Sequence, residues 1–391
     1  MRLALILPPV QPEVYPEVTG CPYAGCGGQH LQHWQAVPKP LRDTVHREVV
    51  AQRYRCVRCG RTFRVYPAGV SHDQTSTRLK GVAVMFYVLG MSYGAVASAM
   101  AALGFPLSKV AVYYAVQDAG AAMAGLRREA VRHGGGRVVG LGVDLTNVRC
   151  GGQWLTVGVS VDAVAGTVLS LDLLANGETA TLTAWVQELA AAIGADILVS
   201  DDADPFKTAA DASGVLQQVC KAHVQRNTEA WVGTITPALA SDADASLARI
   251  GVSPEQAVAD CQALLRLMTE RQPSAAASTT LAGIHQRYLG AAKPAKGATM
   301  SLAYRLRLFS LDRWNLWPRL TRYRTWEGPD GETLDGTNNA CERAIGWWVK
   351  ERYRTMRGYK RPESVLNVSR LIAAMGNALD GPGFPLATVI A

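Results

Sequence analysis

The sequence predicts an α/β protein with a mixed sheet of element order βββαβαβ, interrupted by an all-helical insertion. A cysteine-rich ribbon and a small helical domain precede it. Three observations predict this class. Apolar segments of strand length alternate with segments of helical period between residues 138 and 232. Alanine-rich helical sequence then extends from about residue 241 to 325. Two close cysteine pairs lie within the first sixty residues.

Composition supports a folded protein with several domains. The chain has 391 residues, of which 48% are hydrophobic and 18% charged, which excludes disordered and fibrous classes. Forty Lys and Arg against 32 Asp and Glu give a formal charge of +8, which favours a polyanionic partner. From composition shifts and glycine-rich joints we expect domains at 1–73, 74–133, 134–232, 233–330 and 331–391.

Neither of the two apolar segments near the start of the chain predicts membrane targeting. Residues 1–10 are too short for a secretory signal and predict a first strand. Residues 81–108 carry no charge and are mostly apolar, but glycine, serine and proline interrupt the run. Two packed helices are therefore favoured over a membrane span, and we expect a cytoplasmic protein with no membrane partner.

The four N-terminal cysteines have the spacing of a metal site. Cys21 and Cys26 form one pair and Cys56 and Cys59 the other, and four thiolates can hold one tetrahedral Zn²⁺. Four residues separate the first pair where two are usual, so four unrelated core thiols remain the alternative. A site with four protein ligands is structural, because it has no open position for chemistry.

Other residues of this segment have two interpretations each. His30 and His33 could replace a cysteine ligand or lie free on a strand. Arginines around the second cysteine pair could contact phosphates or form a solvated face. They are Arg53, Arg55, Arg58, Arg61 and Arg64.

Residues 75–131 predict helices. We expect helices at 78–91, at 93–103 and from 109 to about 122, with Ser92 and Ser108 as N-caps of the last two. Two short helices joined by a glycine turn are typical of a helix-turn-helix, with residues 108–117 as the recognition helix. A plain three-helix bundle is the alternative. The candidate base-reading residues are Ser108, Lys109, Tyr113 and Gln117.

The segment from 138 to 220 contains the predicted sheet. Strands are expected at 138–144, 153–161, 167–174, 195–201 and 215–220, with helices at 179–193 and 205–212. The first and fourth strands each end in a carboxylate, Asp144 and Asp201. A later helix, which Asn338 or Asn339 caps, carries Glu342 in its first turn.

These three acids could form a metal site. Neighbouring strands would place Asp144 and Asp201 side by side, and the small residues Gly140 and Gly142 on the same face would leave room for ligands. Carboxylates that converge repel one another, and divalent cations remove that cost. Glu342 would complete an oxygen cage for two Mg²⁺, with Mn²⁺ as a substitute. Acids at strand ends are also ordinary turn residues.

Basic residues near the C-terminal end predict a nucleic-acid surface. Arginines are interleaved with tryptophans between 304 and 324, a pattern that can grip phosphates and stack on bases, although an amphipathic helix with solvated arginines fits equally. The residues expected to line the DNA path are Arg313, Arg319, Arg322, Arg324, Lys350, Arg352, Arg354 and Arg357.

Taken in order, these features resemble the DDE-type transposases of bacterial insertion sequences. The resemblance covers nearly the whole chain: the ribbon, the helix-turn-helix, the βββαβαβ core, the insertion and the Asn-Asn-x-x-Glu-Arg motif at 338–343. The segment Cys220-Lys-Ala-His223 looks like the Cys-x-x-His motif of Mutator-like transposases. The resemblance implies an RNase H-like catalytic fold.

The resemblance also implies roles for individual residues. Asp144, Asp201 and Glu342 would be the metal-binding catalytic triad, with Asp202 as the fallback for the second acid. A further role is implied for His223 and Arg343, which could position the scissile phosphate.

The implied reaction is hydrolysis of phosphodiesters at the element's terminal repeats, followed by attack of the 3′-hydroxyls on target DNA. The partner would be double-stranded DNA, and by analogy a homodimer or larger assembly would act on paired ends. Two other functions fit the same motifs: a catalytically inactive DNA-binding regulator derived from a transposase, and a two-metal nuclease that cuts without joining.

Overall fold

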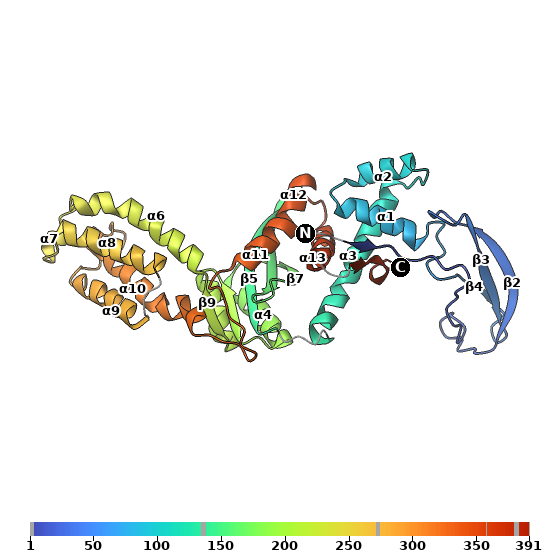
Figure 1. Ribbon diagram of the computed structural model, residues 1–391, viewed down its shortest axis with the longest axis horizontal. Coiled ribbons are helices and arrows are strands. Elements are labelled where there is room, and N and C mark those ends of the chain that lie inside the picture. Colours follow the sequence, from blue (N-terminus) through green and yellow to red (C-terminus); the bar gives the residue numbers. More distant parts are fainter. Residues whose placement is uncertain (1–3, 134–137, 271–273, 357, 379–382, 391) are drawn as a thin grey trace.

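The computed structural model describes residues 4–133, 138–270, 274–356, 358–378 and 383–390. These residues form a mixed α/β chain drawn out along one axis (Figure 1). A small three-stranded sheet lies at one end, a helical bundle at the other, and a five-stranded sheet between them (Figure 1). Across this part of the chain, no helix combines the length and the apolar character needed to cross a bilayer.

The N-terminal region is a three-stranded antiparallel sheet. Its strands are β2 (Leu31–Pro40), β3 (Glu48–Cys56) and β4 (Thr62–Val65), in the order β2-β3-β4. Two prolines lie in β2, which is consistent with its place at the edge, where a missing N–H leaves no partner unsatisfied. The expected first strand is β1 (Leu5–Ile6), which pairs in parallel with β10 (Phe384–Pro385) and joins the two ends of the chain.

Three helices follow: α1 (Thr77–Val88), α2 (Tyr93–Ala102) and α3 (Lys109–His133). The predicted caps form, because Ser92 Oγ accepts the Ala95 N–H at 3.1 Å and Ser108 Oγ accepts the Ala111 N–H at 3.0 Å. Helix α3 runs well past the predicted end near 122.

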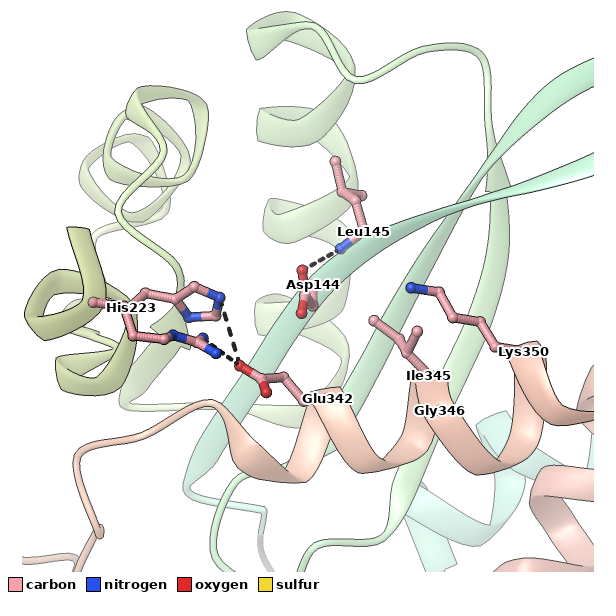
Figure 2. A pocket seen from close by; sticks show the side chains of 8 residues that line it. Asp144, Leu145, His223, Glu342, Ile345, Gly346 and Lys350 are labelled. Carbon is pink, nitrogen blue, oxygen red and sulfur yellow. Dashed lines mark hydrogen bonds and ion pairs between the residues drawn. The ribbon is translucent and has the colours of Figure 1, made fainter. Parts of the chain in front are cut away.

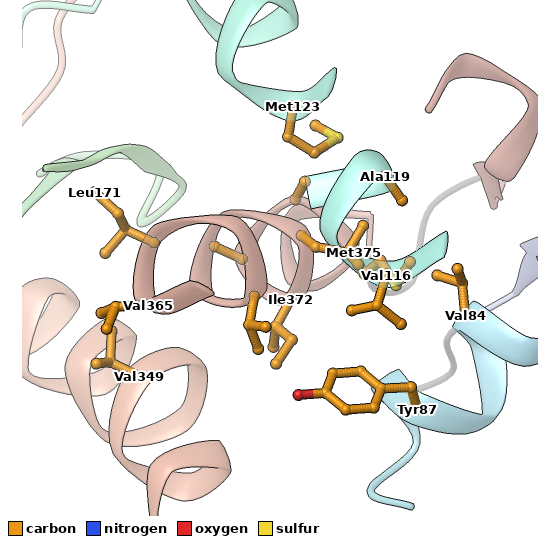
Figure 3. Close-up of a cluster of buried hydrophobic side chains, with 14 of the residues drawn as sticks. Val84, Tyr87, Val116, Ala119, Met123, Leu171, Val349, Val365, Ile372 and Met375 are labelled. Carbon is orange, nitrogen blue, oxygen red and sulfur yellow. The ribbon is translucent and has the colours of Figure 1, made fainter. Parts of the chain in front are cut away.

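Helix α3 packs closely against the last α-helix of the described chain. Helix α13 (Pro362–Asn377) lies along it, and a Cβ on Gly120 would come within 2.2 Å of the Asn367 carbonyl oxygen. The buried side chains of α1–α3, α13 and one face of the central sheet belong to a single hydrophobic cluster (Figure 3). The small helical region and the sheet are therefore packed as one body.

The central sheet has the order β7-β6-β5-β8-β9. Strands β5, β6 and β7 are antiparallel neighbours, while β8 and β9 run parallel to β5. The chain order of these elements is the predicted βββαβαβ. The bounds are β5 Gly140–Cys150, β6 Gln153–Asp162, β7 Val168–Leu174, α4 Thr179–Ile193, β8 Ile197–Ser200, α5 Asp204–Ser213 and β9 Leu216–Val219.

The prediction that the first strand of this sheet ends at Asp144 is wrong. Strand β5 continues to Cys150, because β6 pairs with it along its whole length, from Leu141 opposite Asp162 to Cys150 opposite Gln153. Asp144 therefore lies in the middle of a strand. It lies on the opposite face from Leu141 and Val143, which pack against α4, and so faces the helices at the C-terminal end.

The helical insertion has its own core. Its helices are α6 (Lys221–Ala240), α7 (Ser246–Arg249), α8 (Pro254–Thr269), α9 (Ser274–Arg287) and α10 (Leu302–Leu320). Their apolar side chains form a cluster separate from that of the sheet. Within it the buried Asp260 accepts hydrogen bonds from Arg287 at 2.7 Å and Tyr288 at 2.9 Å, which connects α8 to α9.

The chain returns to the sheet through a 3₁₀ turn (Arg322–Arg324) and a loop, and then forms α11 (Asn339–Ala344). Helix α11 continues without interruption through a π-helical segment (Ile345–Lys350) into α12 (Glu351–Met356). Such π segments occur often at functional sites. A final 3₁₀ turn lies at Leu386–Thr388.

Candidate functional site

A polar cavity lies where β5, α6 and α11 meet. Its volume is about 320 Å³, and Asp144 and Glu342 approach it from different elements (Figure 2). The cavity is lined by Asp144, Leu145, His223, Arg226, Glu342, Ile345, Gly346 and Lys350.

Asp144 is buried enough to resist ionisation. One carboxylate oxygen accepts the Leu145 N–H at 2.7 Å. Burial, together with the negative charges of Asp201 and Glu342, raises the pKa of Asp144 to about 6, although the Leu145 N–H and His223 act in the opposite direction. Asp201 and Glu342 therefore both lie close enough to act electrostatically on Asp144.

Glu342 enters the site from the first turn of α11. Its Oε1 lies 3.5 Å from His223 Nε2 and 3.6 Å from an Arg226 guanidinium nitrogen, both on α6 (Figure 2). The side chain of Asn338, at the N-cap position, makes no capping bond. It instead donates to the Val143 carbonyl at 3.0 Å, and this bond fastens the start of α11 to β5 beside Asp144.

The glycine before Asp144 on the same face has a different role from the one expected. A Cβ on Gly142 would lie 2.7 Å from Val161 Cγ2 and 3.2 Å from Cys341 Sγ. Gly142 therefore makes room for α11 to pack on the sheet. The expectation that it leaves space for ligands is wrong.

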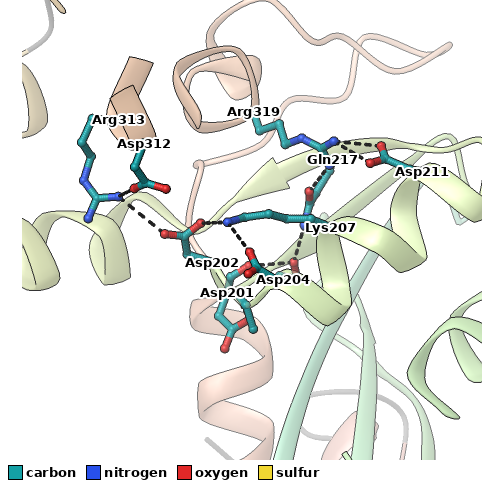
Figure 4. Close-up of polar contacts among 11 residues, drawn as sticks. Asp201, Asp202, Asp204, Lys207, Asp211, Gln217, Asp312, Arg313 and Arg319 are labelled. Atoms are coloured by element: carbon teal, nitrogen blue, oxygen red, sulfur yellow. Dashed lines mark hydrogen bonds and ion pairs between the residues drawn. The ribbon is translucent and has the colours of Figure 1, made fainter. Parts of the chain in front are cut away.

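The contacts of Asp201 and Asp202 distinguish the two candidates for the second acid. Asp202 forms ion pairs with Lys207 at 2.8 Å and Arg313 at 3.6 Å (Figure 4). Among the described residues, the carboxylate of Asp201 accepts a single hydrogen bond, from the backbone N–H of Ala203 at 3.0 Å. Asp201 is not part of the cavity wall, yet its charge acts on Asp144. Asp201 is thus the acid that keeps an uncompensated charge near the site.

The N-terminal cysteines also come together. The sulfurs of Cys21 and Cys59 lie 3.8 Å apart, those of Cys26 and Cys56 lie 3.7 Å apart, and all four lie within 4.8 Å of one another. This arrangement is compatible with a structural metal such as zinc. His33 is not part of the cluster, and its Nε2 contacts Gln52 Oε1 at 2.5 Å.

Arg61 stabilises negative charge in this cluster. Hydrogen bonds from its backbone N–H and its guanidinium lower the pKa of Cys59 to about 6. Burial, in contrast, raises the pKa of Cys21 to about 11. A bound cation would favour the thiolate form of both, because metal binding displaces thiol protons.

Two of the arginines expected on a DNA path are structural. Arg313 is only 4% exposed, pairs with Asp312 at 2.7 Å and donates to Thr228 Oγ at 3.2 Å. Arg319 makes two bonds of 2.8 Å to the carboxylate of Asp211 and connects α10 to α5 (Figure 4). The predicted DNA contact is wrong for Arg313, because a buried guanidinium cannot reach a phosphate. The charge of Arg319 is already balanced by Asp211.

The other basic candidates differ in accessibility. Arg322 is half-buried, and Arg324 is half-buried over the ring of Trp317 at 5.5 Å. Lys350 is exposed and lines the cavity, and Arg354 is exposed beside Glu351. Arg357 and the side chain of Arg352 lie outside the described residues. Arg343 is exposed and donates to the Asn339 carbonyl of its own helix.

The predicted recognition helix turns two of its four candidate residues, Tyr113 and Gln117, toward the protein interior, while Ser108 and Lys109 are exposed. Gln117 is 8% exposed, donates to the Tyr93 hydroxyl and accepts from Asn367. Tyr113 is half-buried, and its hydroxyl lies 3.3 Å from Ser364 Oγ on α13. Base reading by Gln117 is therefore wrong, because α13 covers that face of α3. Lys109 remains exposed.

Sequence reasoning missed Arg226, which lies one helical turn after His223 and faces Glu342. The spacing i, i+3 on a helix was the available signal. It also missed the contact of Asn338 with β5, which no local pattern encodes, because the two residues are 195 positions apart.

No protein-family profile matches the chain, and no curated protein sequence matches it.

Proposed function

We propose that this chain is a DNA transposase of the DDE type, which hydrolyses phosphodiesters at the ends of a mobile element and joins the 3′-hydroxyls to target DNA. The observation that carries the proposal is that Asp144 on β5 and Glu342 on α11 line one cavity, while Asp201, after the end of β8, acts electrostatically on Asp144. These positions are the ones that the resemblance to insertion-sequence transposases implies.

The sheet supports an RNase H-like assignment. Three antiparallel strands followed by two strands parallel to the first, with the order β7-β6-β5-β8-β9, agree with the topology expected of that fold. The first acid on the central strand and the last on a helix packed against that strand agree with the triad. The helical bundle α6–α10 occupies the place of the predicted insertion.

The acidic site suits hard divalent cations. Glu342 Oε1 is buried without a hydrogen-bond partner among the described residues, and the pKa of Asp144 is raised to about 6. Carboxylate oxygens are the ligands that Mg²⁺ and Mn²⁺ prefer, and a cation would relieve both penalties. Asp144, Asp201 and Glu342 would hold Mg²⁺, which when bound would activate the attacking oxygen and stabilise the leaving oxygen.

The remaining residues of the site would hold the DNA. Lys350 on the cavity wall and Arg226 beside Glu342 place two positive charges where a phosphate would enter. Asn338 keeps Glu342 in register with Asp144 by its bond to β5. The cysteine cluster would hold one structural Zn²⁺ in a ribbon that presents the exposed Arg58 to DNA.

The test is a cleavage and joining assay with Mg²⁺ on DNA that carries the inverted repeats flanking the gene. Asp144→Ala, Asp201→Ala and Glu342→Ala should each lower the cleavage rate by about 10²–10³-fold, the cost of one lost charge-stabilising group. Each should retain DNA binding in a gel-shift assay, because phosphate contacts lie elsewhere.

Asp202→Ala is the matched control, because Asp202 is adjacent and its charge is already paired with Lys207. It should cleave far better than Asp201→Ala. Cleavage without joining would assign the nuclease instead. DNA binding with no cleavage by the wild-type protein in Mg²⁺ or Mn²⁺ would assign the regulator.

A further inference from the structure

A second set of potential metal ligands overlaps the acidic site. Cys220 Sγ, a ring nitrogen of His223 and a carboxylate oxygen of Glu342 all lie within 4.8 Å of one another. The distance from His223 Nε2 to Glu342 Oε1 is 3.5 Å, close to the ~3.3 Å that separates two nitrogen or oxygen ligands of one tetrahedral zinc ion. A small contraction toward a common centre would bring all three into coordination range.

The backbone holds these three residues together. Cys220 directly follows β9 and is fully buried, and its sulfur accepts the Asn338 N–H at 3.2 Å. The Lys221 N–H bonds to the Gly336 carbonyl at 2.9 Å. These two bonds join the start of α6 to the start of α11, so the positions of His223 and Glu342 are set by the same junction. The site is thus organised before any ion binds.

One unsatisfied atom of this cluster indicates a cation. Glu342 Oε1, the oxygen that faces His223 Nε2, is buried and without a hydrogen-bond partner among the described residues. A buried polar atom that lacks a partner is destabilising, and coordination of a cation would supply the missing partner. Among the described residues, Arg226 is the only positive group besides His223 that pairs with this carboxylate, and its side chain is 60% exposed.

We propose that Cys220, His223 and Glu342 form a binding site for Zn²⁺, distinct from the four-cysteine cluster. Sulfur and imidazole ligands select zinc over magnesium, and three protein ligands leave one tetrahedral position open for water or a phosphate oxygen. The site shares Glu342 with the proposed Mg²⁺ triad. Zinc bound here therefore withdraws Glu342 from Asp144 and Asp201 and inhibits the proposed cleavage reaction, a consequence that rests on the proposed function.

Metal stoichiometry tests the site without any activity measurement. The full-length protein, stripped with a chelator and dialysed against Zn²⁺, should retain two equivalents, of which the weaker belongs to this site. Cys220→Ser and His223→Gln should each retain one equivalent. Loss of an outer-shell partner costs about 10–100-fold in metal affinity, so loss of a direct ligand should reduce the affinity for the second ion by more than that. With Co²⁺ in place of Zn²⁺, the wild-type protein should show a thiolate-to-metal charge-transfer absorption from Cys220, and Cys220→Ser should lose it.

Two further variants serve as controls for the proposed zinc site. Cys261→Ala removes a thiol that is equally buried but lies in the helical bundle, and should keep both equivalents. Arg226→Gln removes the competing cation and should tighten the second site. His223 is partly exposed, so His223→Gln remains informative if Cys220→Ser fails to fold. One equivalent in the wild-type protein, or a second equivalent that survives both ligand variants, would overturn the proposal.

The inhibition is measured as the ratio of cleavage rates with and without micromolar Zn²⁺ at fixed Mg²⁺. This ratio should fall for the wild-type protein and move toward one for Cys220→Ser. A wild-type ratio of one despite two bound equivalents would refute the inhibition and leave the metal site standing. If the wild-type protein does not cleave DNA at all, the proposed function fails while the stoichiometry still decides the zinc site.

Discussion

The cysteine cluster and the acidic cavity both gather metal-ligating side chains, but the chain assembles them differently. Cys21 and Cys26 lie shortly before β2, Cys56 ends β3, and Cys59 lies in the turn between β3 and β4, so all four belong to one short stretch of the sequence. The three acids are separated by 57 and 141 residues and come from a central strand, a strand end and a helix beyond the insertion. The first cluster is a local structure that a metal can organise; the second requires the whole core to fold first.

The largest expected effect follows from this difference. Cys56→Ser should lose zinc and the fold of residues 4–70 while the central sheet stays folded, because apparent zinc-binding energies of about 10–16 kcal/mol are folding energy in small metal domains. Limited proteolysis and metal analysis measure it. Cys150→Ala, a buried thiol in β5, should keep the zinc. Global unfolding of Cys56→Ser would show that the two regions are not independent.

The acidic cavity should show the opposite behaviour, since its carboxylates destabilise the folded protein when no metal is present. The pKa of Asp144 is raised from 3.8 to about 6, so ionisation of its carboxyl destabilises the folded protein. This destabilisation is absent below about pH 4 and complete above about pH 6. Asp144→Asn should therefore stabilise the chelator-treated protein at pH 7.5 by about 2–3 kcal/mol. Urea unfolding from pH 4 to 8 measures the trend.

The gain from Asp144→Asn should shrink as the pH falls from 6 toward 4. Mg²⁺ should reverse it by stabilising only the wild-type protein, since a ligand stabilises the state that binds it. An Asn variant that is less stable than wild type at pH 7.5 in chelator would contradict the assigned cost of the buried charge.

Packing of α11 on the sheet gives a third, somewhat smaller effect. Gly142→Ala should destabilise the protein by about 1–3 kcal/mol, because the new Cβ meets Val161 and Cys341 in a filled space. It should also slow cleavage by displacing Glu342. Gly233→Ala on α6, where nothing lies within 4 Å, is the control and should be neutral or stabilise by about 0.5–1 kcal/mol. Equal effects of both changes would refute the role of Gly142 in seating α11.

The smallest effect compares the two regions as DNA-binding surfaces. Arg58→Ala near the cysteines and Lys350→Ala on the cavity wall should each reduce the slope of log affinity against log salt by about 0.9, the value of one phosphate contact. Arg249→Ala, exposed on the helical bundle, should leave the slope unchanged. An unchanged slope for Arg58→Ala would limit the cysteine region to a structural role.

Local patterns predicted local structure well. The caps Ser92 and Ser108 form as expected, and the helix predicted at 179–193 has those bounds. The element order of the central sheet follows from period changes that the backbone alone imposes. One error arose where a pairing partner decides, because β5 continues past Asp144 along β6. A second error is the end of α3, which runs to His133 rather than to about residue 122.

The sequence by itself determined the ligands, since the chemistry of thiols and carboxylates and the spacing of the cysteine pairs are local properties. Tertiary structure alone decided which charges remain free to act. Arg313 and Asp202 neutralise each other inside the molecule, whereas Asp201, one residue away, keeps its charge near Asp144. Pairing of this kind depends on how the helical bundle docks on the sheet, and electrostatic interactions between residues a hundred positions apart leave no period in the sequence.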